Sequence, residues 1–91
     1  MISRDEAIRS ANAALSLLDD RIAKDPAYGV YVHAREQLER MLVELGSPYL
    51  PPTPKREWVD IGLMAAKELE STDPDLANAL MDADYDFKHA S

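Results

Sequence analysis

The side chains that could support chemistry in this 91-residue chain are few and poorly spaced for it. His33 and Glu36 lie one helical turn apart, a spacing at which two side chains can share a metal ion, but they are only half of a site. The chain has no cysteine, and its serines lack the sharp turn and neighbouring base that activate a nucleophile. Its three glycines are too far apart to form a phosphate-binding loop. We therefore expect no catalytic residue, no cofactor and no metal site, and interpret His33 and Glu36 as surface residues.

A sharper chemical feature is a group of carboxylates near the end of the chain. At about 100° per residue, Asp75, Asp82 and Asp86 fall within about 40° of one another on a helix, with Tyr85 beside them and away from the apolar face. Asp82 and Asp86 have no Lys or Arg three or four positions away. An exposed aromatic side chain beside unpaired acids is a common composition of protein interfaces, although a solvated helix face can look the same. We predict a partner-binding surface formed by Glu70, Asp73, Asp75, Asp82, Tyr85 and Asp86.

A second candidate surface contains Tyr28, Val32 and Val43. These side chains fall about a third of a turn away from the apolar face of their helix, too far round to pack against the preceding helix. Two interpretations remain open. Either the following proline-rich segment, with Tyr49 and Leu50, covers them, or they form a secondary partner-binding site.

The net charge of -7 belongs to one part of the chain. Residues 1–56 contain eight acids and eight bases, whereas residues 57–91 contain nine acids and two bases. Negative charge repels nucleic-acid phosphates and anionic lipids, so we expect no nucleic-acid partner and no membrane partner. The first residues lack the basic start of an export signal, and no apolar run approaches the roughly 20 residues of a membrane span. These features predict a cytoplasmic protein whose partner is a basic protein.

Apolar residues recur at steps of three and four along most of the chain, which is the period of an amphipathic helix. Residues 1–91 are expected to form a single all-α domain, a small antiparallel bundle of about four helices near 4–24, 27–45, 54–70 and 74–88. The first helix should turn inward a face of Ile8, Ala11, Leu15, Leu18 and Ile22.

Caps and prolines set the expected ends of these helices. Ser3 precedes the first helix with capping-box spacing to Glu6, and Asp73 before Pro74 begins the fourth. The segment 46–56 contains four of the six prolines and should form a stiff crossover between the second and third helices. We expect Thr53 to cap the third helix.

Three groups of residues resemble one known family. They are Pro26-x-Tyr28-x-Val30, then Ala34-x-x-Gln37-Leu38, and above all Ala66-Lys67-Glu68-Leu69-x-x-Thr72-Asp73-Pro74-x-Leu76-x-x-Ala79-Leu80-x-Asp82-Ala83-x-Tyr85. Their order and spacing are similar to those of the Tsi-six immunity family, which protects bacteria against a type VI secretion effector that degrades NAD and NADP. The resemblance extends over most of residues 5–87.

The resemblance implies a small antitoxin that binds the toxin domain of a delivered effector and blocks its active site without doing chemistry itself. A toxin cleft that attracts a phosphate-bearing dinucleotide would be basic, which suits an acidic inhibitor. The free protein could be a homodimer. The alternative is a non-catalytic helical interaction module, either self-associating or an acidic mimic of DNA.

Overall fold

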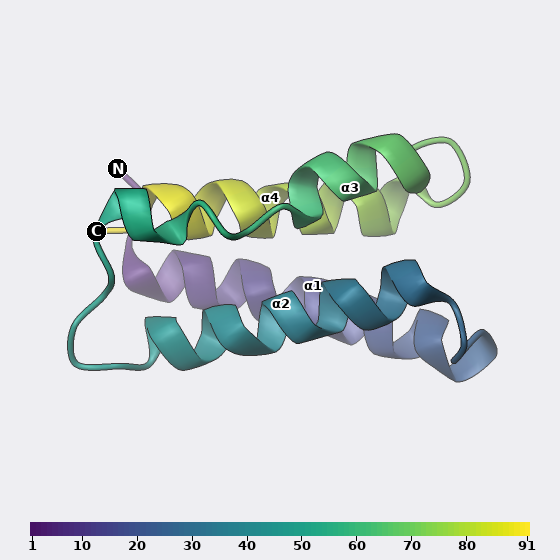
Figure 1. The fold of residues 1–91 in the computed structure, drawn as a ribbon, viewed down its shortest axis with the longest axis horizontal. Coiled ribbons are helices and arrows are strands. Elements are labelled where there is room, and N and C mark those ends of the chain that lie inside the picture. Colours follow the sequence, from purple (N-terminus) through teal and green to yellow (C-terminus); the bar gives the residue numbers. More distant parts are fainter.

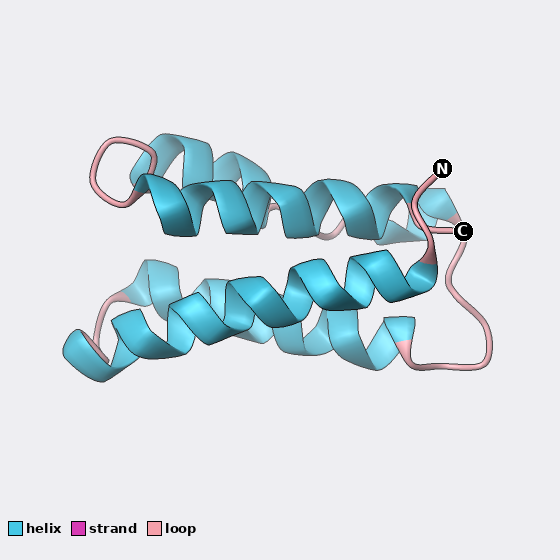
Figure 2. Ribbon diagram, turned by 180° about the vertical axis from the view of Figure 1, so that it is seen from behind, coloured by secondary structure: helices cyan, strands magenta, loops and turns pink.

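The computed structural model describes all 91 residues, which form an antiparallel bundle of four α-helices. The first two helices make one hairpin and the last two make another, and the hairpins pack against each other (Figure 1). Seen from behind, α1 and α4 lie side by side (Figure 2). The elements are α1 (Arg4–Lys24), α2 (Gly29–Leu45), a short 3-10 turn η1 (Thr53–Arg56), α3 (Ile61–Glu68) and α4 (Pro74–His89). The predicted fold class, an all-α bundle, is confirmed, and none of the helices is both long and apolar enough to cross a bilayer.

Two predicted helix starts agree with the structure in detail. The Ser3 hydroxyl accepts a hydrogen bond from the Glu6 amide at 3.1 Å, and the Asp73 carboxylate accepts one from the Leu76 amide at 3.3 Å. These bonds satisfy amides that have no partner inside the helix. The second helix begins at Gly29 and not at residue 27, because residues 26 and 27 form a turn.

The third predicted helix, 54–70, is wrong as a continuous element. The chain instead forms η1 (Thr53–Arg56), a turn containing Trp58, and a short α3 that ends at Glu68. Pro52, not Thr53, is the cap of η1. The Gln37 side chain causes the break: its amide nitrogen donates to the Trp58 carbonyl at 3.4 Å, and its oxygen accepts from the Asp60 amide at 3.0 Å. These backbone groups therefore have partners on α2 in place of helical ones.

The buried face of α1 is also shifted from the expected one. Ala7, Ala11, Ala14 and Leu18 are buried, whereas the expected core residues Ile8, Leu15 and Ile22 lie only partly buried at the edges. The shift follows from the position of α1, which packs against α2 on one side and α4 on the other. Small alanine side chains at the centre allow close approach of both neighbours, and the larger residues fill the flanks.

The two chain ends meet beside η1. Ile2 and Ala90 form an isolated bridge, and the Ser91 amide donates to the Ile2 carbonyl at 3.0 Å. Arg56, which is 5% exposed, donates from Nη1 to the carbonyls of Phe87 and Ala90, at 2.9 and 2.7 Å. Its Nε donates to the Pro51 carbonyl at 2.7 Å. Burial lowers the pKa of this guanidinium, and no carboxylate forms an ion pair with it, so three carbonyl groups hold its charge.

Candidate partner interface

The outer face of α4 presents most of the predicted partner-binding residues to solvent. Asp75, Asp82 and Tyr85 are exposed, because the opposite face of the helix carries the buried Leu76, Leu80, Ala83 and Phe87. The exposed Glu70 precedes this helix in the α3–α4 turn. None of these three carboxylates forms an ion pair. We call Glu70, Asp75, Asp82 and Tyr85 the acidic face.

Tyr85 is held in place within this face by its neighbour one turn later. It stacks on the His89 ring with centroids 4.1 Å apart and planes inclined by 21°. His89 Nδ1 lies 2.8 Å from the Tyr85 carbonyl oxygen, which accepts the hydrogen bond. Tyr85 is nevertheless 57% exposed, so its aromatic ring faces solvent one turn from the unpaired Asp82.

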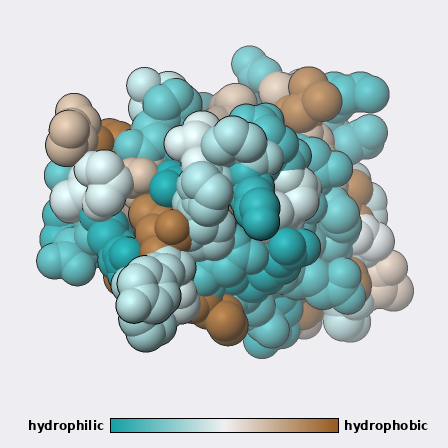
Figure 3. All heavy atoms as spheres, turned by 60° about the vertical axis from the view of Figure 1, so that its left-hand side comes forward, coloured by the Kyte–Doolittle hydropathy of each residue, from teal (hydrophilic) through white to brown (hydrophobic).

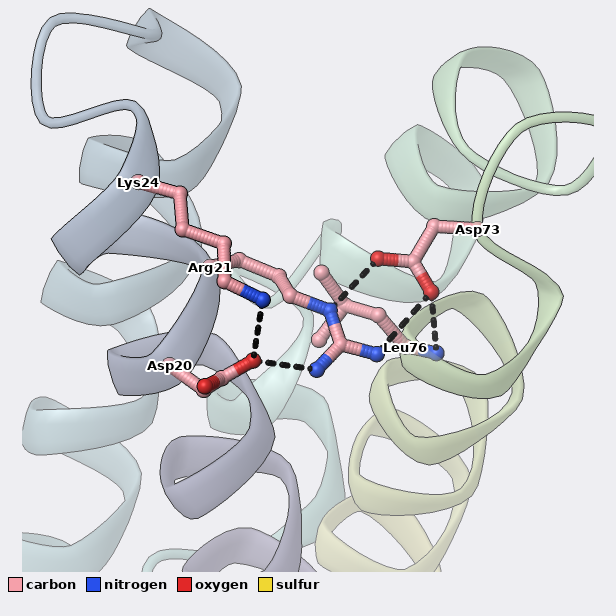
Figure 4. A network of polar contacts seen from close by, with 5 residues as sticks. All are labelled: Asp20, Arg21, Lys24, Asp73 and Leu76. Atoms are coloured by element: carbon pink, nitrogen blue, oxygen red, sulfur yellow. Dashed lines mark hydrogen bonds and ion pairs between the residues drawn. The ribbon is translucent and has the colours of Figure 1, made fainter.

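Two of the six predicted residues, Asp73 and Asp86, instead contact α1. Asp86 accepts a hydrogen bond from the Ser10 hydroxyl. Asp73 accepts two from Arg21, at 2.8 Å from Nε and 3.3 Å from Nη2, while it also caps α4 (Figure 4). Asp86 forms no ion pair, as its sequence neighbours indicated, but it is only partly exposed, because α1 supplies a hydroxyl donor to it. Both side chains fasten α4 to α1.

The Arg21–Asp73 pair leads to a prediction about acid stability. The hydrogen bond from Arg21 holds the pKa of Asp73 below its usual value. The folded protein therefore binds fewer protons at this site than the unfolded chain, so the pair stabilises the fold above about pH 4, the pKa of a free Asp, and loses this effect as the pH falls through the folded pKa. Asp73→Asn keeps a side chain able to cap α4 but loses the ion pair.

Asp73→Asn should thus unfold more easily than wild type at pH 7, with the difference disappearing as the pH approaches 2. Urea unfolding followed by circular dichroism between pH 7 and 2 measures this. Asp82→Asn, which removes an exposed carboxylate without an ion-pair partner from the middle of the same helix, is the matched control, and its unfolding free energy should follow that of wild type at each pH. If the difference in unfolding free energy between Asp73→Asn and wild type were the same at every pH, the role assigned to the ion pair would be contradicted.

A groove of about 450 Å³ lies between α3 and the last turns of α4. Its apolar lining includes Leu63 and Met81, and Tyr85 belongs both to the groove and to the acidic face. The two helices approach closely because Gly62 has no side chain: its amide donates to Asp84 Oδ2 at 2.8 Å, and a Cβ at this position would lie 2.9 Å from the same oxygen. The sequence pattern did not reveal this groove, although a glycine inside a helical pattern was a signal for it.

His33 is part of a polar cluster between α2 and α3 that the sequence pattern also missed. Its Nε2 lies 2.8 Å from Asp60 Oδ1, and Gln37 Nε2 donates to the same oxygen at 2.8 Å. The hydrogen bond with His33 lowers the pKa of Asp60. His33 is thus paired with Asp60 and not with Glu36, and no group of three or more His, Cys, Asp or Glu side chains converges anywhere in the structure.

The second candidate surface is only partly exposed. Tyr28 packs edge-to-face on Tyr31, with centroids 4.8 Å apart, against the core. Val32 and Val43 are 43% and 73% exposed. The proline-rich segment leaves these two valines uncovered, and its Tyr49 is itself 87% exposed, whereas its Leu50 packs against the core. At the end of the bundle that carries the termini, apolar side chains form separate spots among hydrophilic ones (Figure 3).

The structure is thus a small helical bundle with an exposed acidic face, and comparison with known proteins gives the family. The sequence matches the Tsi6 family over residues 6–89. The immune protein Tsi6 of Pseudomonas aeruginosa is 36% identical over 78 residues, which cover 86% of this chain and 82% of that protein. The solved structure of Tsi6 from the same organism matches with a TM-score of 0.81 at 36% identity, covering 89% of this chain and 93% of that chain.

This chain therefore belongs to the Tsi6 family of immunity proteins. The resemblance seen in the sequence is confirmed. Members of this family give immunity to a type VI secretion effector by binding the cognate toxin. The chain is therefore an inhibitor and not an enzyme.

Proposed function

We propose that this chain neutralises its cognate effector by covering the toxin's active site with the acidic face. The observation that carries the proposal is the set of three exposed carboxylates without ion-pair partners, Glu70, Asp75 and Asp82, spread along α4 and the turn before it, with the exposed Tyr85 one turn beyond Asp82. Leaving like charges unpaired on one surface destabilises the free protein slightly, whereas a basic partner would be attracted by them.

The sequence resembles the family that protects against an NAD- and NADP-degrading effector, which supports a toxin cleft with positive charge. Such a cleft must attract the phosphates of its substrate, and the same field would attract the acidic face. Tyr85 would supply the buried aromatic contact on which affinity depends, and the carboxylates would speed association and fix orientation. The inhibitor would act in the cytoplasm, where a delivered toxin reaches its substrate.

The test is co-expression of this chain with the toxin domain of the effector encoded beside its gene. Wild-type chain should restore growth to a bacterial host that expresses the toxin, and the two proteins should purify as a complex. Asp73→Asn, which alters a contact between α1 and α4 outside the acidic face, should also protect. Growth arrest with wild-type chain present, together with no complex, would overturn the proposal.

A further inference from the structure

The exposed apolar side chains of α3 and α4 gather at one place, the groove between these helices. The residues Leu63 and Tyr85 are 68% and 57% exposed, and both line this groove. Neither side chain belongs to the core, because α3 buries Ile61 and Ala65 on its inner side and α4 buries its own apolar face. Leu63 and Tyr85 are thus two large apolar side chains that remain exposed to solvent, one from each helix of the groove. Such a pair is typical of a surface that binds a partner's side chain.

The groove has the size and the polarity to hold such a side chain. Its volume of about 450 Å³ falls within the range of about 300–1,000 Å³ of sites that enclose small ligands. Met81 adds to its apolar lining. An apolar side chain, or the methylene part of a longer one, would displace water from these walls.

The charges at the groove favour a basic partner. Lys88 is already neutralised by Asp84, with Nζ 2.9 Å from Oδ1, so it does not repel an incoming cation. Asp60 accepts its two side-chain hydrogen bonds on Oδ1 alone, from the direction of α2. The unpaired Asp82 lies one turn from Tyr85 on α4.

We infer that this groove, lined by Leu63, Met81 and Tyr85, receives an apolar side chain of the effector toxin from a segment that also carries Lys or Arg. The inference rests on the proposed function and extends it. Unpaired charge on the acidic face would guide the toxin, and the groove would hold it, which makes Leu63 and Tyr85 the residues that determine affinity.

Two pairs of matched variants test the inference. Leu63→Ala and Tyr85→Ala remove side chains that line the groove, whereas Lys55→Ala and Tyr49→Ala remove exposed side chains of comparable size from the segment after α2, outside both candidate surfaces. Binding to an inactive variant of the toxin domain encoded beside this gene is measured by isothermal titration calorimetry, and thermal unfolding checks that each variant is folded. We expect Kd to rise tenfold or more for the groove variants, and less than twofold for the controls.

Four outcomes are distinguishable. The expected pattern supports the groove as the toxin site. Wild-type binding with all four variants within twofold of it would overturn the groove and leave the proposed function standing. Failure of the wild-type chain to bind the toxin domain would overturn the proposed function as well. A wild-type dimer in sedimentation that Leu63→Ala converts to monomers would show that a second copy of this chain fills the groove, and would overturn its assignment to the toxin.

Discussion

Reversing two charges on the acidic face, in the double variant Glu70→Lys/Asp82→Lys, should slow association with the toxin domain about 100-fold at 0.1 M salt. The net charge changes by four, from -7 to -3, and two positive groups would face the proposed basic cleft of the toxin. Electrostatic attraction acts mainly on the association rate, so dissociation should change less. Asp75 is left intact because its carboxylate also lies in the first turn of α4, where negative charge stabilises the helix.

The control reverses two exposed acids elsewhere that have no ion-pair partner, in the double variant Asp25→Lys/Glu36→Lys. It has the same net charge of -3 and should associate within about fivefold of wild type, because distant charges are screened beyond about 10 Å at 0.1 M salt. Stopped-flow fluorescence at several salt concentrations measures both rates. Equal slowing by the two double variants would mean that overall charge, and not the acidic face, drives association.

Replacing the buried arginine, in Arg56→Met, should lower the free energy of unfolding by about 3 kcal/mol, since bonds to a charged donor contribute about 1.5–3 kcal/mol each and the orphaned carbonyls regain only part of this from water. Three carbonyls, those of Pro51, Phe87 and Ala90, would lose their donor together. These contacts join η1 to the end of α4, so the C-terminal turn should also become less protected from hydrogen exchange.

Lys55→Met is the matched control for this variant. It removes the same charge and introduces the same side chain one position earlier, where the lysine is exposed and unpaired. Its unfolding free energy should stay within about 0.5 kcal/mol of wild type. Urea unfolding at pH 7 measures both variants. Equal stability of Arg56→Met and Lys55→Met would contradict the structural role of the buried guanidinium.

Helix ends that depend on neighbouring residues were predictable from the sequence. The break in the third helix, which depends on a residue far away in the chain, was not. Ser3 and Asp73 cap their helices by bonding amides three residues on, so the sequence around each start contains the whole interaction. The break in the third helix depends on Gln37, which lies 23 residues before Asp60. Its position among apolar residues on the inner side of α2 was the available signal that a buried amide must find backbone partners.

The same distinction explains the result for the acidic face. A helical projection separates the inner and outer sides of α4, and it correctly placed Asp75, Asp82 and Tyr85 outside. It contains no information about the helix alongside, so it could not show that α1 brings Ser10 to Asp86 and Arg21 to Asp73. Predicting the groove would also require the relative position of two helices, because the groove depends on where Gly62 of α3 contacts α4.

The central claim, that the chain blocks a toxin's active site, is tested most directly by titrating it into the active toxin domain encoded beside its gene. With the proposed NAD-degrading activity of the toxin as the readout, NAD consumption is followed as the inhibitor is added at toxin concentrations well above Kd. Occlusion predicts that activity falls linearly and reaches zero at one inhibitor per toxin, while Glu70→Lys/Asp82→Lys requires longer preincubation to reach the same end point. Full activity in a toxin saturated with the inhibitor would contradict occlusion of the active site.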